Sequence, residues 1–260
     1  MQIEIDVRMR YAMPPATALL IQVEAAQTAG QEIVSAQIDT GNCSHFARIG
    51  AEDGIGERIW LRAADDFKFS YRALVEINRQ NFDISRLNAV EPHLLPGETV
   101  KYLLPSRFCP SDNFHNFVTS EFGGLEGGPL IAAFATWISE KFTYQPGSSG
   151  THTTAQDSFV QRQGVCRDYA HVLITLARTA TIPARFASVY APNVTPLDFH
   201  AVAEVYLDGA WYLVDPTGMA GPTDIATIGV GQDAASVAFM TSYGPATFVS
   251  QQVNVTSVAP

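Results

Sequence analysis

The 260-residue sequence has few cysteines and few basic residues, and both shortages limit what the protein can be. Its three cysteines, Cys43, Cys109 and Cys166, are far apart. An odd number at such distances argues against a disulfide framework and favours reduced thiols in a cytoplasm. Only 16 Lys and Arg stand against 26 Asp and Glu, so the formal net charge is −10. We therefore expect a cytoplasmic protein without a nucleic-acid partner.

Long apolar runs and metal-binding patterns are missing as well. No apolar stretch approaches the roughly 20 residues that span a bilayer, and the amino terminus, MQIEIDVRMR, lacks the apolar centre of a secretory signal. The residues of ligand type, Cys43, His45, Cys109, His115 and His152, fit no zinc spacing. No dense acidic cluster predicts a calcium site. We expect no membrane association, no metal and no cofactor.

Two domains are predicted from the patterning of the chain. Up to about residue 80, short segments of alternating polar and apolar residues are separated by turn formers such as Asp53-Gly54, which predicts an antiparallel β-sandwich or barrel-like module. Residues 91–113 hold four prolines and are typical of a connector. The predicted division is an all-β domain over 1–95 and a second domain over 96–260, with a core at 125–219 and carboxy-terminal strands at 220–260. The sequence leaves open which sheet those last strands join.

The second domain is predicted to combine helices with a sheet, which makes the chain α+β. Apolar residues on one helical face indicate a helix near 130–142, and shorter patterns indicate helices at about 155–162 and from Cys166 onward. Strand-like runs begin at Ala184, His200 and Ala210. The last two runs are joined by Asp208-Gly209, a strong hairpin signal because both turn residues must tolerate positive φ.

This hairpin lets two polar residues be located relative to one another. If Asp208 and Gly209 form the turn, Leu207 lies opposite Ala210, and His200 and Asp215 become diagonal neighbours on one face of the sheet. At the roughly 7 Å typical of such positions, an imidazole and a carboxylate can meet. Each residue also has a structural interpretation on its own, since His200 could be a satisfied sheet histidine and Asp215 could start a turn.

Cys166 lies where a helix amino terminus favours a thiolate. The unpaired N–H groups and the dipole of the helix stabilise the anion, and the same N–H groups can receive the oxyanion of a tetrahedral intermediate. A lone cysteine is more often a buried structural residue. Together with a histidine base and a carboxylate that orients it, the pattern indicates a nucleophile.

The stretch GVCRDYAHVLITLARTATIPARFASVY, followed by HAVAEVYLDGAWYLVDPTG, resembles the catalytic blocks of the transglutaminase-like superfamily over residues 164–218. The preceding β segment is similar to the region that accompanies bacterial members. The resemblance implies a papain-like catalytic fold with Cys166 as nucleophile, His200 as general base and acid, and Asp215 as its orienter.

Residues around this trio are further candidates for the site. Many members carry Trp where this chain has Val202, so the pocket wall beside His200 is expected to differ. Glu204 shares the face of His200 and could bind a polar group in the cleft. The second oxyanion donor is left open among Trp137, Gln156 and Gln163, which each offer an N–H upstream of the cysteine.

The predicted activity is acyl transfer on amide or peptide bonds through a thioester. Hydrolysis of a peptide or protein substrate is favoured over protein cross-linking, because water needs no second binding site and no sequence feature identifies one for an amine. A transglutaminase with an amine acceptor, and a non-catalytic scaffold that binds a protein partner, are the alternatives. The sequence does not determine the oligomeric state.

Overall fold

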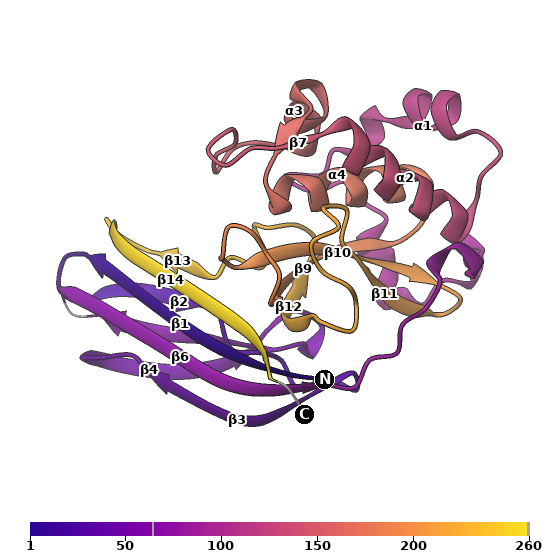
Figure 1. Cartoon of the computed structure of the whole chain (residues 1–260). Helices are drawn as coiled ribbons and strands as arrows, with labels where there is room; N and C mark the ends of the chain where they lie inside the picture. The colour runs from indigo at the N-terminus through magenta and orange to yellow at the C-terminus, as the bar shows by residue number, and fades with distance from the viewer. Residues whose placement is uncertain (64, 259–260) are drawn as a thin grey trace.

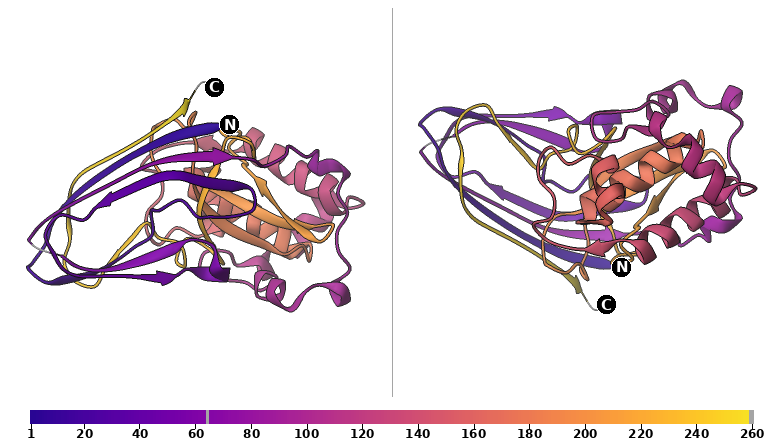
Figure 2. Two further views of the ribbon diagram at one scale, coloured as in Figure 1. Left: turned by 90° about the horizontal axis from the view of Figure 1, so that it is seen from below. Right: turned by 90° about the horizontal axis from the view of Figure 1, so that it is seen from above.

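The computed structural model describes residues 1–63 and 65–258. The alternating segments near the amino terminus form six strands, in which every second side chain is buried wherever a strand covers the core, as in β1, where Ile3, Ile5 and Val7 point inward. Their bounds are β1 (Gln2–Ala12), β2 (Thr17–Ile21), β3 (Gln31–Asp39), β4 (Cys43–Gly50), β5 (Glu57–Ala63) and β6 (Asp66–Ile77). These strands supply most of two antiparallel four-stranded sheets that face one another as two layers (Figures 1 and 2). We call this unit the sandwich.

Two strands from the far end of the chain complete the sandwich. β13 (Met240–Ser242) pairs with β2, and β14 (Thr247–Val258) pairs with β1 along its whole length. The sheet orders are therefore β14-β1-β6-β3 and β13-β2-β5-β4, and the end of β14 lies beside the start of β1, with Val258 opposite Gln2 (Figure 1). The predicted assignment of 220–260 to the second domain is corrected for these two strands, because Val253 and Val255 are buried only where β14 covers the edge of the sandwich.

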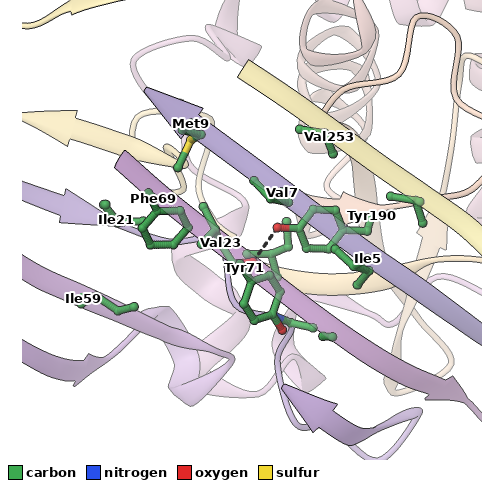
Figure 3. Packing of buried hydrophobic residues seen from close by; sticks show 14 of the residues in the cluster. Ile5, Val7, Met9, Ile21, Val23, Ile59, Phe69, Tyr71, Tyr190 and Val253 are labelled. Atoms are coloured by element: carbon green, nitrogen blue, oxygen red, sulfur yellow. Dashed lines mark hydrogen bonds between the residues drawn. The ribbon is translucent and has the colours of Figure 1, made fainter. Parts of the chain in front are cut away.

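The core of the sandwich also takes a side chain from outside it. Figure 3 shows Tyr190 among Ile5, Val7 and Tyr71, with the two tyrosine rings stacked at 6.4 Å between centroids. The hydroxyl of Tyr190 donates a hydrogen bond to the carbonyl of Val23 at 2.6 Å. This buried ring anchors the second half of the molecule to the first.

Short 3-10 turns lie along the connection between the two halves. They are η2 (Ile84–Arg86), η3 (Pro92–Leu94), η4 (Gly97–Tyr102) and η5 (Ser111–Asn113), whereas η1 (Glu52–Gly54) lies between β4 and β5 in the sandwich. The prolines of the predicted connector begin or flank several of these turns, since proline pre-sets φ but cannot donate to a longer helix. η4 ends just ahead of Pro105.

The remaining elements form a layer of helices on a four-stranded sheet, as Figure 1 shows. The helices are α1 (His115–Phe122), α2 (Gly127–Lys141), α3 (Ala155–Gln161) and α4 (Cys166–Thr179). The sheet has the order β11 (Ala210–Val214), β10 (His200–Leu207), β9 (Ala184–Tyr190) and β12 (Ala226–Gly231), all antiparallel. We call it the central sheet. The predicted α+β class, with a sandwich ahead of a helix-and-sheet unit, is confirmed.

Helix α4 is buried along almost its full length between the central sheet and helices α2 and α3. Its side chains pack on Ala201, Ala203 and Val205 of β10, while the opposite face of the sheet forms a separate small core around Val202 and Leu213. Within the described residues, no helix combines the length and the apolar character needed to cross a membrane.

Candidate active site

Cys166 occupies the first position of α4 because the residues around it end an extended segment and cap a helix. Val165 is extended, with φ −113°. The buried carboxylate of Asp168 accepts the Val165 N–H at 2.8 Å and the Ser149 hydroxyl. A carboxylate in the first turn satisfies a free N–H and complements the helix dipole. Gly164 makes room for it, since a Cβ there would lie 2.6 Å from the Asp168 Cβ.

The predicted hairpin brings a histidine and an aspartate together on the central sheet. The register runs from Leu207 opposite Ala210 to Ala203 opposite Val214, as the turn at Asp208-Gly209 requires, and is confirmed. Just beyond the paired residues, His200 Nε2 and Asp215 Oδ2 are 2.8 Å apart, with both side chains almost completely buried. A carboxylate can only accept, so Nε2 is the donor.

Asp215 is itself held by three further donors. Its Oδ1 accepts the N–H of Thr217 at 2.9 Å and the hydroxyl of Thr217 at 2.7 Å, and its Oδ2 accepts the N–H of Ala220 at 3.0 Å. Burial raises the pKa of Asp215, but the hydrogen bond and charge of His200, with the donors of Thr217, lower it below its usual value. The carboxylate is therefore ionised and fixed in orientation.

Asp215 binds only one of the two ring nitrogens of His200. Nδ1 is buried and has no hydrogen-bond partner among the described residues. Burial lowers the pKa of His200, but the Asp215 hydrogen bond and the neighbouring Cys166 sulfur outweigh it and raise the pKa to about 9. The sulfur thus lies close enough to act on the imidazole without the geometry of a hydrogen bond. At neutral pH, His200 carries a proton on each ring nitrogen.

Tyr144 also borders Cys166, although sequence reasoning did not identify it. It lies in the two-residue strand β7 (Thr143–Tyr144), which pairs in parallel with β8 (Gln163–Gly164), so Tyr144 is opposite Gly164. Burial and the neighbouring Cys166 sulfur raise the pKa of Tyr144, and the phenol oxygen approaches the Cys166 backbone N–H. The phenol keeps its proton and can donate it. Two-residue strands carry no periodic pattern, so no signal in the sequence marks this residue.

Comparison with known proteins bears on this arrangement. A family profile described as the transglutaminase-like superfamily matches residues 127–216, from the start of α2 to just past Asp215. The crystal structure of a protein from Cytophaga hutchinsonii, described as a "putative cysteine protease", is 30% identical, covers 100% of this chain and 91% of that one, and aligns with a TM-score of 0.91. The chain belongs to the transglutaminase-like superfamily.

Two further relatives of this transglutaminase-like protein cover less of it or resemble it less. An uncharacterized protein of Mycobacterium leprae is 32% identical over 117 residues, so the match spans 42% of this chain and 42% of that protein. The periplasmic domain of TgpA from Pseudomonas aeruginosa is 18% identical, covers 81% of this chain and 86% of that one, and aligns with a TM-score of 0.40.

The other candidates from the sequence have different neighbours in this transglutaminase-like fold. Val202 is completely buried in the small core behind the sheet. Glu204 is mostly buried and accepts a hydrogen bond from the Arg185 guanidinium at 2.6 Å, and it also lines a pocket with Arg79 and Trp211. Val202 and Glu204 lie two and four residues after His200 in β10. Val202 contacts the small core, and Glu204 contacts Arg185.

The three proposed oxyanion donors have the following neighbours in the structure. Trp137 stacks on Phe159 at 5.5 Å and lies under the Arg162 guanidinium. The exposed side chain of Gln156 accepts a hydrogen bond from Asn113 at 2.8 Å. Gln163 takes part in β8 through its backbone, opposite Thr143 in β7. Tyr144 is a further side chain that borders the thiol.

A second group of Cys, His and Asp lies in the core and not in a site. Cys109 and His171 are completely buried, and burial raises the pKa of the Cys109 thiol to about 12 and lowers that of His171 to about 3. Asp233 accepts the N–H of Phe108 at 2.9 Å. A neutral, buried thiol is inert, so Cys109 joins the connector to α4 and takes no part in chemistry.

Proposed function

We propose that this protein is a cysteine-dependent enzyme that cleaves amide or peptide bonds through a thioester, with Cys166 as nucleophile, His200 as acid and base, and Asp215 as its orienter. The observation that carries the proposal is the bonded, buried pair of His200 and Asp215 beside a cysteine at a helix amino terminus. Family membership and the cysteine protease description of the Cytophaga hutchinsonii relative support it.

The chemistry follows from the protonation states. The raised pKa of His200 favours an imidazolium, which stabilises a Cys166 thiolate next to it. The thiolate attacks the substrate carbonyl carbon and forms a tetrahedral oxyanion. His200 Nδ1 then gives its proton to the leaving amine, the C–N bond breaks and a thioester is left. Water attacks the thioester while Nδ1 takes up a proton, and collapse releases the acid and the thiolate.

Two donors are available for the oxyanion. The Cys166 backbone N–H lies at the start of α4, where N–H groups have no partner within the helix. The phenol of Tyr144 is protonated and adjoins the same N–H. We propose that these two groups stabilise the oxyanion, in the way that a backbone N–H and one side-chain donor commonly share this task.

Hydrolysis is the proposed outcome, because water needs no binding site of its own. A non-catalytic scaffold is disfavoured, since binding a partner does not require a paired histidine and aspartate next to a cysteine at a helix amino terminus. Peptides and proteins are the proposed substrates.

The test is turnover of a mixture of peptides with varied side chains, with products identified by mass spectrometry. Cys166→Ala should lower the activity at least about 10³-fold, while the variant keeps its thermal unfolding transition. Tyr144→Phe, which removes only one hydroxyl, should lower kcat about 10- to 100-fold. Cys43→Ala, at a partly exposed thiol in the sandwich, is the matched control and should leave turnover unchanged.

A separate measurement distinguishes an enzyme from a scaffold. Cys166 should react with iodoacetamide well below pH 8, and faster than Cys43 and Cys109, if its thiolate is stabilised. Full turnover by Cys166→Ala would exclude the proposed nucleophile. Equal, slow alkylation of all three thiols would favour the scaffold.

A further inference from the structure

The segment that leads into β10 holds a carboxylate in a fixed position next to the reacting groups. Asp198 precedes His200 by two residues. Its Oδ1 accepts the N–H of Phe199 at 2.7 Å and the amide Nε2 of Gln251 at 2.6 Å. The second bond crosses from the helix-and-sheet unit to the sandwich, so both halves of the molecule determine where this carboxylate points.

Gln251 reaches Asp198 because of its register in the sandwich. It lies in β14 opposite Met9 of β1, whose side chain is buried. Residues directly opposite in an antiparallel pair point to the same side of the sheet. Gln251 therefore points inward at the edge of the sandwich, where the segment between β9 and β10 passes. The edge strand β14, which no local sequence pattern assigned to this sheet, supplies this donor.

The carboxylate of Asp198 lacks a cation. Among residues 1–63 and 65–258, no Lys or Arg forms an ion pair with it, and its Oδ2 has no hydrogen-bond partner there, in contrast to the ion-paired carboxylates Asp6, Asp53 and Asp66. The residue stays in contact with solvent, yet burial raises the pKa of its carboxyl above the usual value against the two hydrogen bonds. The carboxylate is therefore both accessible from solvent and free of an ion pair among the described residues.

The charge of Asp198 reaches the thiol side of the site, two residues ahead of His200. Besides burial and Cys166, the charge of Asp198 raises the pKa of Tyr144, and it does the same, after burial, to Tyr11 of β1. Tyr144 borders Cys166, as its pairing opposite Gly164 requires. The Asp198 carboxylate thus lies between the sandwich and the groups that would carry the reaction, within the range at which one charge acts on another.

We propose that Asp198 is the cation-binding group of the cleft and that it selects substrates carrying an ammonium group close to the bond that Cys166 attacks. This inference rests on the proposed function, because selection of substrates requires that the protein turns them over. The ammonium group can belong to the acyl part of the substrate, as a lysine side chain or a free amino terminus does, or to an amine that replaces water as acyl acceptor. Gln251 and the Phe199 N–H hold the carboxylate in position.

The charge in the cleft can be measured without knowing the substrate. Three thiol reagents of similar size are compared: neutral methyl methanethiosulfonate, cationic 2-aminoethyl methanethiosulfonate and anionic 2-sulfonatoethyl methanethiosulfonate. The rate of disulfide formation is read by mass spectrometry on the peptide that contains Cys166. Asp198→Asn, which keeps an oxygen for both donors, should lower the ratio of the cationic to the anionic rate about five-fold, as expected for one charge at such a distance.

The matched control is Asp112→Asn. Asp112 is exposed in η5, at the end of α4 opposite to Cys166, where the Thr179 hydroxyl binds the Ser111 carbonyl. A helix of 14 residues spans about 20 Å, twice the screening length at physiological salt. This variant removes the same charge and should leave the ratio unchanged. Equal ratios in the wild type and Asp198→Asn would overturn the proposal, as would an equal change in both variants.

The second arm identifies the source of the ammonium group in turnover. Peptides that carry lysine at each position in turn are compared with the same peptides carrying acetyllysine, and 1,5-diaminopentane is compared with 1-aminopentane as acyl acceptor. The wild type should favour the charged member of one comparison at least five-fold, and Asp198→Asn should lose that preference. Activity that requires Cys166 but shows no such preference would overturn the inference alone, whereas activity that survives Cys166→Ala would overturn the proposed function.

Discussion

The carboxylate of Asp215 accepts four hydrogen bonds, and only one of them comes from a group with a chemical task. The other three, from Thr217 and Ala220, fix its two oxygens against rotation. The residue that follows the hairpin strand is thus a rigid acceptor for His200 Nε2. Its second effect is electrostatic, because a buried anion stabilises the imidazolium.

Asp215→Asn should therefore lower the pKa of His200 from about 9 towards the ordinary imidazole value, since the amide keeps an acceptor but not the charge. The folded-state pKa is raised, so the imidazolium stabilises the protein below the unfolded pKa of about 6.5, and this contribution is lost as the pH rises through about 9. In the wild type, the free energy of unfolding should fall across this window by about 3 kcal/mol.

Titration of the His200 ring protons by NMR, together with denaturant unfolding at several pH values, checks this expectation. The variant should titrate at lower pH and show a flatter dependence of stability between about pH 6.5 and 9. Asp112→Asn, which loses the same charge far from the site, should behave as the wild type does. A His200 pKa that does not move in Asp215→Asn would show that burial and Cys166 alone determine it.

At the scale of elements, the part of the site carried by a local signal was predictable. The Asp208-Gly209 turn needs two positive φ angles, which are 45° and 81° here, and a two-residue turn leaves only one register for the strands that it joins. The relation of His200 to Asp215 follows from that register. The beginning of α4 at Cys166 is similarly local.

Elements whose partners lie far away in the chain were not predictable in the same way. β7 and β8 are two residues long, so their pairing depends on where α2 and α4 are packed and not on a pattern of their own. β14 has clear alternation, but alternation does not specify which of several free sheet edges a strand will join. Tyr144 and Gln251 depend on these two pairings, and neither could be identified from the sequence.

The start of α4 provides a prediction at this scale. Gly164→Ala would place a Cβ 2.6 Å from the Cβ of Asp168 and 2.9 Å from its Oδ2, so the capping carboxylate would have to move. We expect a loss of stability of about 1–3 kcal/mol and slower alkylation of Cys166, because the N–H groups at the helix start lose their alignment. Thermal unfolding and iodoacetamide kinetics measure the two effects.

Gly150→Ala is the control for this substitution, since a Cβ at that position meets nothing within 4 Å and its φ is not positive. It should change neither quantity by more than a small amount. If Gly164→Ala lost stability but kept the wild-type alkylation rate, the cap would support the helix without affecting the thiol.

The two halves of the whole molecule meet at a turn of the sandwich. η1 lies between β4 and β5, and its Asp53 accepts bonds from Arg185 of β9 at 2.9 Å and from the Tyr102 hydroxyl at 2.6 Å. Arg185 in turn pairs with Glu204 and lies over the ring of Trp211. Such a partly buried network is costly to break but contributes little where it is intact, so its main effect is to specify how the halves dock.

Close backbone contact at the same turn transmits that docking to the central sheet. Gly56 has φ +81°, and a Cβ there would lie 2.2 Å from the carbonyl oxygen of Ile228 in β12. Next to Ile228, Thr227 pairs with Val189 of β9, and Val189 pairs with His200 of β10. The sandwich therefore contacts the central sheet two strands away from the imidazole.

Gly56→Ala should move the Ile228 carbonyl and, through β12 and β9, disturb His200. Gly54→Ala is the matched control, because Gly54 also has a positive φ, of +70°, but a Cβ there meets nothing within 4 Å. Positive φ alone costs alanine about 1–2 kcal/mol, so both variants should lose that much in denaturant unfolding. Gly56→Ala should lose about 1–3 kcal/mol more, as forced repacking does, and its Cys166 should be alkylated more slowly.

Equal losses of stability in the two variants, with unchanged alkylation, would mean that the sandwich is attached to the central sheet without supporting the geometry of the site. An excess loss of stability together with slower alkylation would mean that the sandwich contributes to the reactivity of Cys166, although Cys166, His200 and Asp215 all belong to the other half of the molecule.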